Sequence, residues 1–186
     1  MEKKISGKKV TNTALCIIPP NDLWPDIQNI RFICDPAYER WMPHINLAFP
    51  FVPPDDFVKA KQMLEAELAD FSAFKITFKE LGYFTGGKKG VLWAKPGVDG
   101  DQLNELENRI VKIFPFCNDQ VTKSKDGFNP HMTLGNFPTK EIASKKAQYQ
   151  KDWTTKEFVV DKLNLIKRDG QDTPFYVVET VALKLD

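Results

Sequence analysis

The stretch Pro43-His44-Ile45-Asn46-Leu47 returns later in the chain as Pro130-His131-Met132-Thr133-Leu134. Both copies contain a proline, a histidine, an apolar residue, a polar residue and a leucine in that order, and together they use both histidines of the sequence. On a strand, side chains two residues apart share a face. Each copy therefore predicts a strand that presents an imidazole beside a neutral hydrogen-bonding group and turns its apolar residues into the core.

If these two strands lie side by side, the imidazoles of His44 and His131 face one polar pocket. The pKa of histidine lies near working pH, so one neutral imidazole can remove a proton from water or a ribose hydroxyl while the other, protonated, delivers one to a leaving oxygen. Asn46 and Thr133 can donate hydrogen bonds to non-bridging phosphate oxygens, where charge grows in the transition state. Phosphodiester hydrolysis or cyclic-phosphate opening can use this arrangement, and the candidate catalytic residues are His44, His131, Thr133 and Asn46.

The bulk composition is compatible with this chemistry. The 186 residues, 42% of them hydrophobic, fit one domain or one domain of two small lobes. The net charge of +1 gives no sign of the basic face that tight duplex binding needs. No apolar run approaches a signal peptide or the ~20 residues of a membrane span. We expect a cytoplasmic protein without a membrane segment. The lysines between residues 3 and 9 are a candidate nuclear address, and a frayed, solvated N-terminus is the alternative.

Apolar spacing outlines the elements around the two motifs. Strands are expected at 13–19, 43–49, 74–84, 90–94, 131–134, 157–167 and 174–184, and helices at 22–35, 57–71, 101–113 and 139–151. Asp55 and Asp56 are well placed to cap the second helix. A helix followed by a histidine strand occurs twice, and this mixture favours an α+β fold over a doubly wound sheet. We expect residues 1–12 to be a mobile N-terminus.

The paired motifs resemble those of the 2H phosphoesterase superfamily, whose signature is two His-x-Thr/Ser-x elements with apolar residues at x. The likeness covers most of the chain and is greatest to the branch of 2′-5′ RNA ligase-like proteins and 2′,3′-cyclic phosphodiesterases. It implies one duplicated, bilobal α+β domain over residues 13–186, with two antiparallel-rich sheets lining a central cleft and helices outside. Asn46 departs from the signature, because an amide replaces the hydroxyl.

The resemblance also implies an activity. It predicts hydrolysis of a 2′,3′-cyclic phosphate or a 2′-5′ linkage, without a metal or cofactor, in a small nucleotide or RNA end, by a protein that we expect to be a monomer. It implies a basic residue near the substrate phosphate on the final strands. Arg168 is preferred to Lys167, although the register of the strand leaves both open. Tyr176 follows the final turn as a further candidate for binding. Aromatic residues of the central strands are candidates for stacking on a base, with core packing as the alternative: Tyr83, Phe84 and Trp93.

Other interpretations of the same residues stay open. A nucleotide- or RNA-end-binding module with little turnover would keep both motifs, whereas a purely structural domain would leave them unexplained. A metal site would need a third ligand, and neither motif carries a carboxylate at the matching position. The glycine- and lysine-rich run at 86–90 lacks the spacing of a phosphate-binding loop and predicts a hairpin turn instead.

Overall fold

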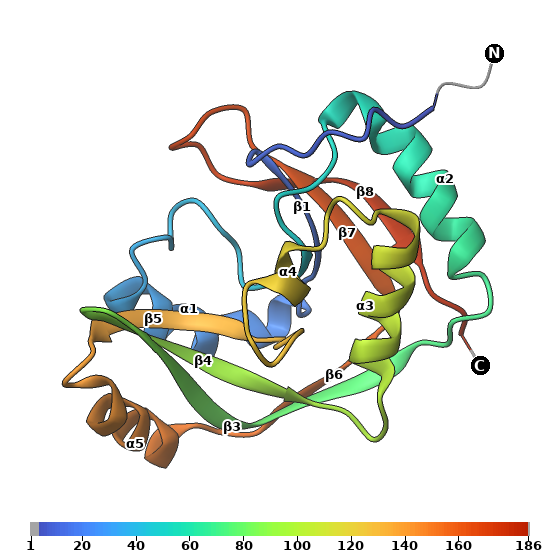
Figure 1. The fold of residues 1–186 in the computed structure, drawn as a ribbon. Helices are drawn as coiled ribbons and strands as arrows, with labels where there is room; N and C mark the ends of the chain where they lie inside the picture. The colour runs from blue at the N-terminus through green and yellow to red at the C-terminus, as the bar shows by residue number, and fades with distance from the viewer. Residues whose placement is uncertain (1–3, 186) are drawn as a thin grey trace.

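The computed structural model describes residues 4–185, which form two four-stranded sheets flanked by helices (Figure 1). The first sheet has the order β2-β1-β7-β8, with β1 Thr13–Ile17, β2 Ile45–Ala48, β7 Lys162–Lys167 and β8 Tyr176–Ala182. The second has the order β5-β4-β3-β6, with β3 Phe74–Gly86, β4 Lys89–Gly97, β5 Met132–Pro138 and β6 Lys156–Val160. All neighbouring strands within these two sheets run antiparallel. The predicted α+β class is confirmed.

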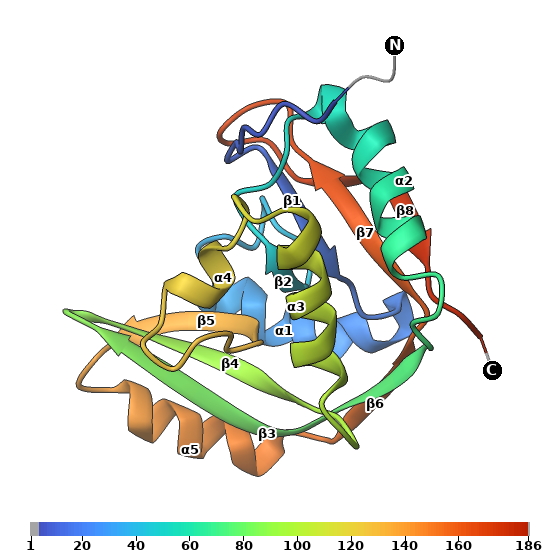
Figure 2. The same cartoon turned by 45° about the vertical axis from the view of Figure 1, so that its right-hand side comes forward.

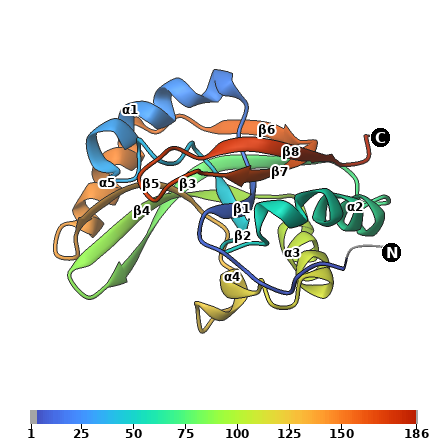
Figure 3. The same cartoon turned by 90° about the horizontal axis from the view of Figure 1, so that it is seen from above.

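Helices cover the sheets at two ends of the molecule. They are η1 Asn21–Leu23, α1 Trp24–Cys34, η2 Pro54–Asp56, α2 Phe57–Glu67, α3 Gln102–Ile113, α4 Asp119–Thr122 and α5 Ile142–Asp152. The helix α5 lies along the β3–β4 hairpin, and α2 lies beside β8 (Figure 2). Seen from above, α1 and α5 gather at one end and α2 and α3 at the other (Figure 3). Within residues 4–185, no helix has the length and apolar character that a membrane crossing requires.

The two sheets repeat one plan. In each, the strand of a histidine motif lies at the edge and pairs with the strand of its sheet that precedes it in the chain: β2 with β1, and β5 with β4. The helix after β1, α1, packs on β5, and the helix after β4, α3, packs on β2. The strands β2 and β5 also contact each other directly. The duplication therefore brings the two motif strands together, although 87 positions separate their histidines in the sequence, 131 minus 44.

One hydrophobic core joins the two sheets. It contains the apolar residues of both motifs, none of which is exposed: Ile45, Leu47, Met132 and Leu134. Burying a side chain of this size contributes roughly 1.5–3 kcal/mol. Because neighbouring strand residues point to opposite faces, this burial directs the histidine and the polar residue of each motif to the other face of the sheet.

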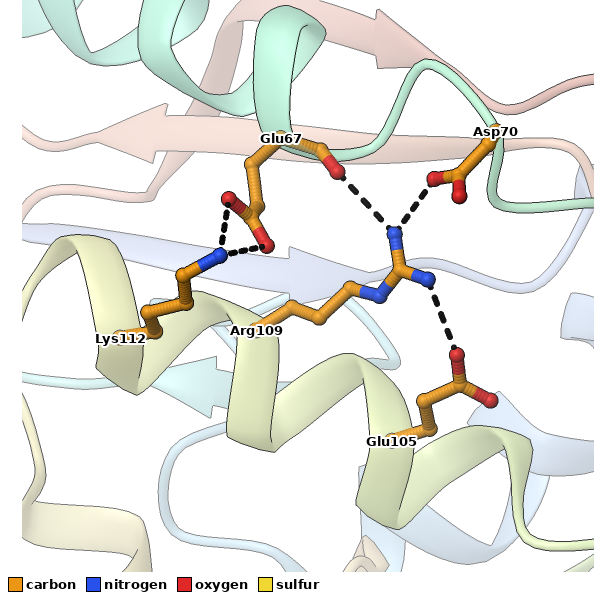
Figure 4. A network of polar contacts seen from close by, with 5 residues as sticks. All are labelled: Glu67, Asp70, Glu105, Arg109 and Lys112. Carbon is orange, nitrogen blue, oxygen red and sulfur yellow. Dashed lines mark hydrogen bonds and ion pairs between the residues drawn. The ribbon is translucent and has the colours of Figure 1, made fainter.

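A polar network holds α2 and α3 together at their surface (Figure 4). Arg109 of α3 donates to the backbone carbonyl of Glu67 at 3.1 Å and to the carboxylates of Asp70 and Glu105. Lys112 donates to both carboxylate oxygens of Glu67 at 3.0 Å. Exposed ion pairs each contribute at most ~1 kcal/mol, so the network orients α3 more than it stabilises the fold. The helix that it orients is the one that packs on β2.

The predicted strand 157–167 is in fact two strands that belong to different sheets. β6 pairs with β3 of the second sheet, and β7 pairs with β1 of the first. The positions that face the main core change phase between them, since Val160 of β6 and Leu163 and Leu165 of β7 belong to that core, whereas Ile166 belongs to the smaller cluster on the other face. That phase change at Asp161 marks the point where the chain crosses from one sheet to the other.

Two residues before the first strand, Ser6 and Lys9, bond to the rest of the domain. The sequence predicted that Asp56 caps α2, but its side chain makes no capping hydrogen bond. Its carboxylate instead accepts hydrogen bonds from the backbone N–H and the hydroxyl of Ser6. Lys9 pairs with Asp119 at 2.7 Å. The mobile N-terminus at 1–12 stays a prediction: residues 1–3 lie outside the described residues, while Ser6 bonds to η2 and Lys9 to α4.

Candidate active site

Each histidine lies one residue before its strand and is held by the same backbone contact. Nδ1 of His44 is 2.7 Å from the carbonyl oxygen of Met42, and Nδ1 of His131 is 2.8 Å from that of Asn129. A carbonyl oxygen can only accept a hydrogen bond, so Nδ1 carries the proton in both rings. In the neutral form each Nε2 then keeps its lone pair for a substrate proton. The two histidines therefore share the same tautomer as well as the same sequence motif.

The ring of His44 stacks on an indole. It lies 4.5 Å from Trp41 between ring centroids, with 18° between the planes. Trp41 also packs on Phe175, with 3.9 Å between ring centroids and a tilt of 32° between the planes, and meets the edge of Phe49 at 5.1 Å. These rings cover a small apolar cluster on the face of β1 that carries Cys16. Because Cys16 pairs directly with Asn46, His44 and Asn46 share this face, as predicted.

The ring of His131 instead meets aromatic edges. Its centroid lies 5.0 Å from that of Phe84 at 89° and 6.2 Å from that of Trp93 at 64°. Trp93 pairs with Thr133 across β4 and β5, so Thr133 shares the face of His131. Gly82 lies under Trp93, and a Cβ there would come 2.6 Å from the indole ring. Only glycine at this position lets the indole lie flat against β3.

Burial keeps the imidazole of His44 neutral. Desolvation lowers the pKa of His44 to about 4, against the hydrogen bond to Met42, which raises it. The charges of Arg31 and His131 lower this pKa further, and Asp35 raises it. The contribution of His131 is consistent with the direct contact between the two motif strands, β2 and β5.

The pKa of His131 is lowered in the same way. Burial is the main cause, the hydrogen bond to Asn129 opposes it, and the charge of Lys123 adds to the lowering. Lys123 follows α4, and its ammonium lies 5.8 Å from the ring centroid of Phe49, which contacts Trp41 beside His44. Lys123 therefore lies near the rings around His44 and also acts on His131. Sequence reasoning did not single out Lys123, because the short helix that places it shows no amphipathic repeat.

A buried ion pair supports the loop before His44. Arg31 of α1 is 2% exposed and pairs with Asp35 at 2.8 Å. Its guanidinium also donates to the backbone carbonyl of Trp41 at 2.8 Å and to the side chain of Gln28 at 2.8 Å. This contact fixes the loop that carries both the indole and the carbonyl to which His44 binds. The i,i+4 spacing of Arg31 and Asp35 was the available sequence signal for it.

Two polar atoms near the histidines are buried without a partner among the described residues. One is Oδ1 of Asn46, and the other is Nε1 of Trp93. A buried polar atom without a hydrogen bond costs about 1–3 kcal/mol. One of these unsatisfied atoms lies beside each histidine. Thr133 is half-buried on the same face as His131.

The three predicted binding residues lie in different surroundings. Arg168 is 7% exposed, and its guanidinium donates to the carbonyls of Gln171 at 2.7 Å and Thr11 at 3.1 Å. The exposed Tyr176 donates its hydroxyl to Asp169 at 3.0 Å. Tyr83 is exposed and precedes Phe84 on β3, so it points to the opposite face from the ring that contacts His131. Their contact with substrate stays a prediction, whereas Trp41, Phe84 and Trp93 are the aromatic residues grouped around the two imidazoles.

The glycine-rich run forms the predicted hairpin turn between β3 and β4, with Gly87 at φ 59°.

A cavity of about 500 Å³ lies next to the loop of His44 and is lined in part by Met42, Trp24, Asn164 and Phe158. Within residues 4–185, no group of three His, Cys, Asp or Glu side chains is arranged to hold a metal ion.

Fold and motifs together define the class: a two-lobed α+β protein with one histidine strand in each lobe. A family model described as the 2′-5′ RNA ligase superfamily matches residues 19–172, and the chain belongs to this superfamily, the 2H phosphoesterase group that its motifs resemble. No curated protein sequence matches the chain.

Solved structures share this fold at low sequence identity. E. coli LigT complexed with 3′-AMP has a TM-score of 0.63 and 16% identity, over 94% of this chain and 98% of LigT. A structure described as a phosphoesterase has a TM-score of 0.63 and 15% identity, over 95% of this chain and 99% of that one. E. coli LigT complexed with ATP has a TM-score of 0.55 and 15% identity, over 95% of this chain and 99% of LigT.

Proposed function

We propose that this protein hydrolyses an RNA-type phosphodiester, either a 2′,3′-cyclic phosphate or a 2′-5′ linkage, with His44 and His131 as its acid–base pair and without a metal. The observation that carries the proposal is the matched pair of Nδ1–carbonyl hydrogen bonds. They leave Nε2 of both rings free for proton transfer. Membership of the 2′-5′ RNA ligase superfamily supports RNA phosphodiester chemistry.

The reaction needs one neutral and one protonated imidazole. The neutral Nε2 accepts a proton from water as the water oxygen bonds to phosphorus, and the protonated Nε2–H delivers its proton to the ribose oxygen as the P–O bond breaks. The products are a phosphate monoester and a free hydroxyl. The imidazole that was neutral is now protonated, and the one that was protonated is now neutral. A bound phosphate anion raises the pKa of a nearby imidazole and thereby offsets the lowering that burial causes in the free protein.

Two polar side chains complete the proposed site. The hydroxyl of Thr133 and the side-chain amide of Asn46 donate to the non-bridging oxygens, where charge grows in the transition state. E. coli LigT, which shares the fold, was solved with 3′-AMP and with ATP. We propose a substrate of the same kind, a small nucleotide or an RNA end.

A substrate panel tests the proposal. Nucleoside 2′,3′-cyclic phosphates, 2′-5′ and 3′-5′ dinucleotides and ADP-ribose cyclic phosphate are incubated with the protein, with and without excess chelator, and each product is identified. We expect turnover of a cyclic phosphate or the 2′-5′ dinucleotide at the same rate in chelator. Binding of these compounds without turnover would instead make the protein a nucleotide- or RNA-end-binding module. A loss in chelator that a divalent ion restores would make it a metallohydrolase.

A further inference from the structure

Four side chains stack in a column that ends at His44. Trp41 has two ring neighbours at stacking distance, His44 at 4.5 Å and 18° and Phe175 at 3.9 Å and 32°. Two rings at these separations and tilts can only occupy opposite faces of the indole. The guanidinium of Arg168 lies 4.9 Å from the ring centroid of Phe175 and continues the series. We call Arg168, Phe175, Trp41 and His44 the aromatic column.

The column is tied to the backbone at several points. The N–H of Phe175 donates to the carbonyl of Arg40 at 2.8 Å, which joins the loop after β7 to the loop before β2. The guanidinium of Arg168 donates to two backbone carbonyls and, among the described residues, forms no ion pair, while its buried Nε has no hydrogen-bond partner there. A buried cation without a counter-ion is costly unless other groups stabilise it, and here two carbonyl oxygens and the face of an aromatic ring offset part of that cost. Phe175 and Arg168 are 5% and 7% exposed, so the column is a built part of the structure.

We propose that Trp41, Phe175 and Arg168 are positioning residues that set the plane of the His44 imidazole, a role that rests on the proposed function. The Nδ1 hydrogen bond to Met42 restrains the ring at one atom, and coupled changes of χ1 and χ2 can still tilt the ring plane. Stacking on Trp41 opposes this tilt, so the two contacts together aim Nε2. Both faces of Trp41 are occupied, which excludes it as a platform for a substrate base. For Arg168 the geometry favours this role over the predicted phosphate contact.

The column also controls the hydration of His44. Contact with the electron-rich indole favours the imidazolium, whereas exclusion of water disfavours it. Burial is the largest influence on the pKa of His44, and the charged groups that face the ring are Arg31, Asp35 and His131. Opening the column therefore raises the pKa of His44 toward its ordinary value and loosens the ring.

Imidazole NMR provides the test, because the chain has only two histidines and a His131→Ala variant assigns both sets of signals. The variants are Trp41→Leu, Trp41→Phe, Phe175→Leu and Arg168→Met. We expect the pKa of His44 to rise by about one unit in Trp41→Leu, less in the others, while that of His131 stays within a few tenths. On a turned-over substrate we expect kcat to fall about 10- to 100-fold in Trp41→Leu with KM little changed, and Trp41→Phe to restore most of it.

The matched control is Trp153→Phe, which removes a partly buried indole that packs on the main core, outside the column, and donates to the carbonyl of Phe78 at 2.9 Å. It should lower stability without changing the titration of His44. The proposal is overturned if folded Trp41→Leu, or folded Phe175→Leu where the first variant does not fold, keeps the wild-type pKa of His44. Failure of the proposed function looks different, since His44→Ala would then keep full turnover while the NMR titrations still report on the column.

Discussion

The two histidine motifs have the same backbone geometry and different ring surroundings. In both, Nδ1 donates to the carbonyl two residues earlier. His44 is then stacked face to face on Trp41, whereas His131 meets the edges of Phe84 and Trp93. The backbone contact fixes the tautomer and is common to both halves. What differs is the contact that fixes the ring plane and excludes water, and this is where the two imidazoles can acquire different roles.

The helices that cover the motif strands differ in a similar way. α1 packs on β5 and α3 packs on β2, and each buries one charged residue, Arg31 at 2% and Glu107 at 1% exposure. Arg31 is fully engaged by Asp35, Gln28 and the backbone of Trp41. Both carboxyl oxygens of Glu107 have no hydrogen-bond partner among the described residues. One half of the molecule thus satisfies its buried charge, and the other keeps a carboxyl that must stay protonated.

The largest expected effect comes from removing either imidazole. His44→Ala and His131→Ala should each lower kcat by about 10²–10⁴-fold, the range that one positioned acid or base contributes. The double variant should lose less than the product of the two single losses, because the groups act as a unit. Steady-state kinetics on one cyclic phosphate and one 2′-5′ dinucleotide measure this, with circular dichroism to confirm folding. Wild-type turnover by a folded His131→Ala variant would contradict the acid–base assignment.

The polar partners should differ more than the histidines do. Thr133→Ala removes a donor to the transition state and should cost about 10²–10³-fold in kcat, while Thr133→Ser, which keeps the hydroxyl, should be mild. Asn46→Thr should keep activity and change the preference between cyclic phosphate and 2′-5′ substrates, since it exchanges one donor for another and removes the unpartnered Oδ1. The same two assays decide. An equal loss in Thr133→Ser and Thr133→Ala would show that the site needs the threonine methyl group instead of the hydroxyl.

The sequence predicted the pair of motifs, their shared faces and the α+β class because these depend on local alternation and on a repeat visible in five residues. The column was not predictable, since Trp41 and Phe175 are 134 positions apart, 175 minus 41, and meet only through tertiary packing. Tyr83 illustrates the limit of alternation. Neighbouring residues on β3 point to opposite faces of the sheet, and the pattern alone does not say whether Tyr83 or Phe84 lies on the face of His131. The crossing at Asp161 was missed because no glycine or proline separates β6 from β7, so the pattern predicts a single strand from the apolar residues on both sides of Asp161 and Lys162.

Glu107 should make stability depend on pH. Burial raises the pKa of Glu107 to about 8 from an ordinary value of 4.5. Between these values the folded state keeps a proton that the unfolded state has lost, so the free energy of unfolding falls as pH rises from about 4.5 to 8. Glu107→Gln removes this dependence and should stabilise the protein by about 1–3 kcal/mol at pH 8 and little at pH 5. Urea denaturation at both pH values measures it, and the exposed Glu105→Gln on the same helix is the matched control. A gain of equal size at both pH values would contradict the titration of Glu107.

The pair should work best on the acidic side of neutrality. In the free protein the pKa of both histidines is lowered from 6.5, that of His44 to about 4. The active form holds one proton between the two rings, so kcat/KM falls about tenfold per pH unit once pH exceeds the higher pKa, and falls again below the lower one. We expect the maximum of kcat/KM below pH 6.5. Initial rates at substrate concentrations far below KM, from pH 4 to 9, give the profile, and a maximum at pH 8 or above would contradict it.

The smallest expected effect concerns the two cations that lower the pKa of the histidines, Arg31 beside His44 and Lys123 beside His131. Arg31 acts on His44 from a buried ion pair, whereas Lys123 acts on His131 from an exposed position at the end of α4. Water and salt screen an exposed charge, so Lys123→Gln should raise the pKa of His131 by only a few tenths of a unit and leave that of His44 unchanged. The shift should shrink further at 1 M salt, where the screening length is about 3 Å. Imidazole NMR titrations of wild type and Lys123→Gln at low and high salt measure all four values. A shift of a full unit that persists at high salt would mean that Lys123 is held against His131 in a water-excluded contact, and the two halves would then resemble each other in their charges as well as in their backbones.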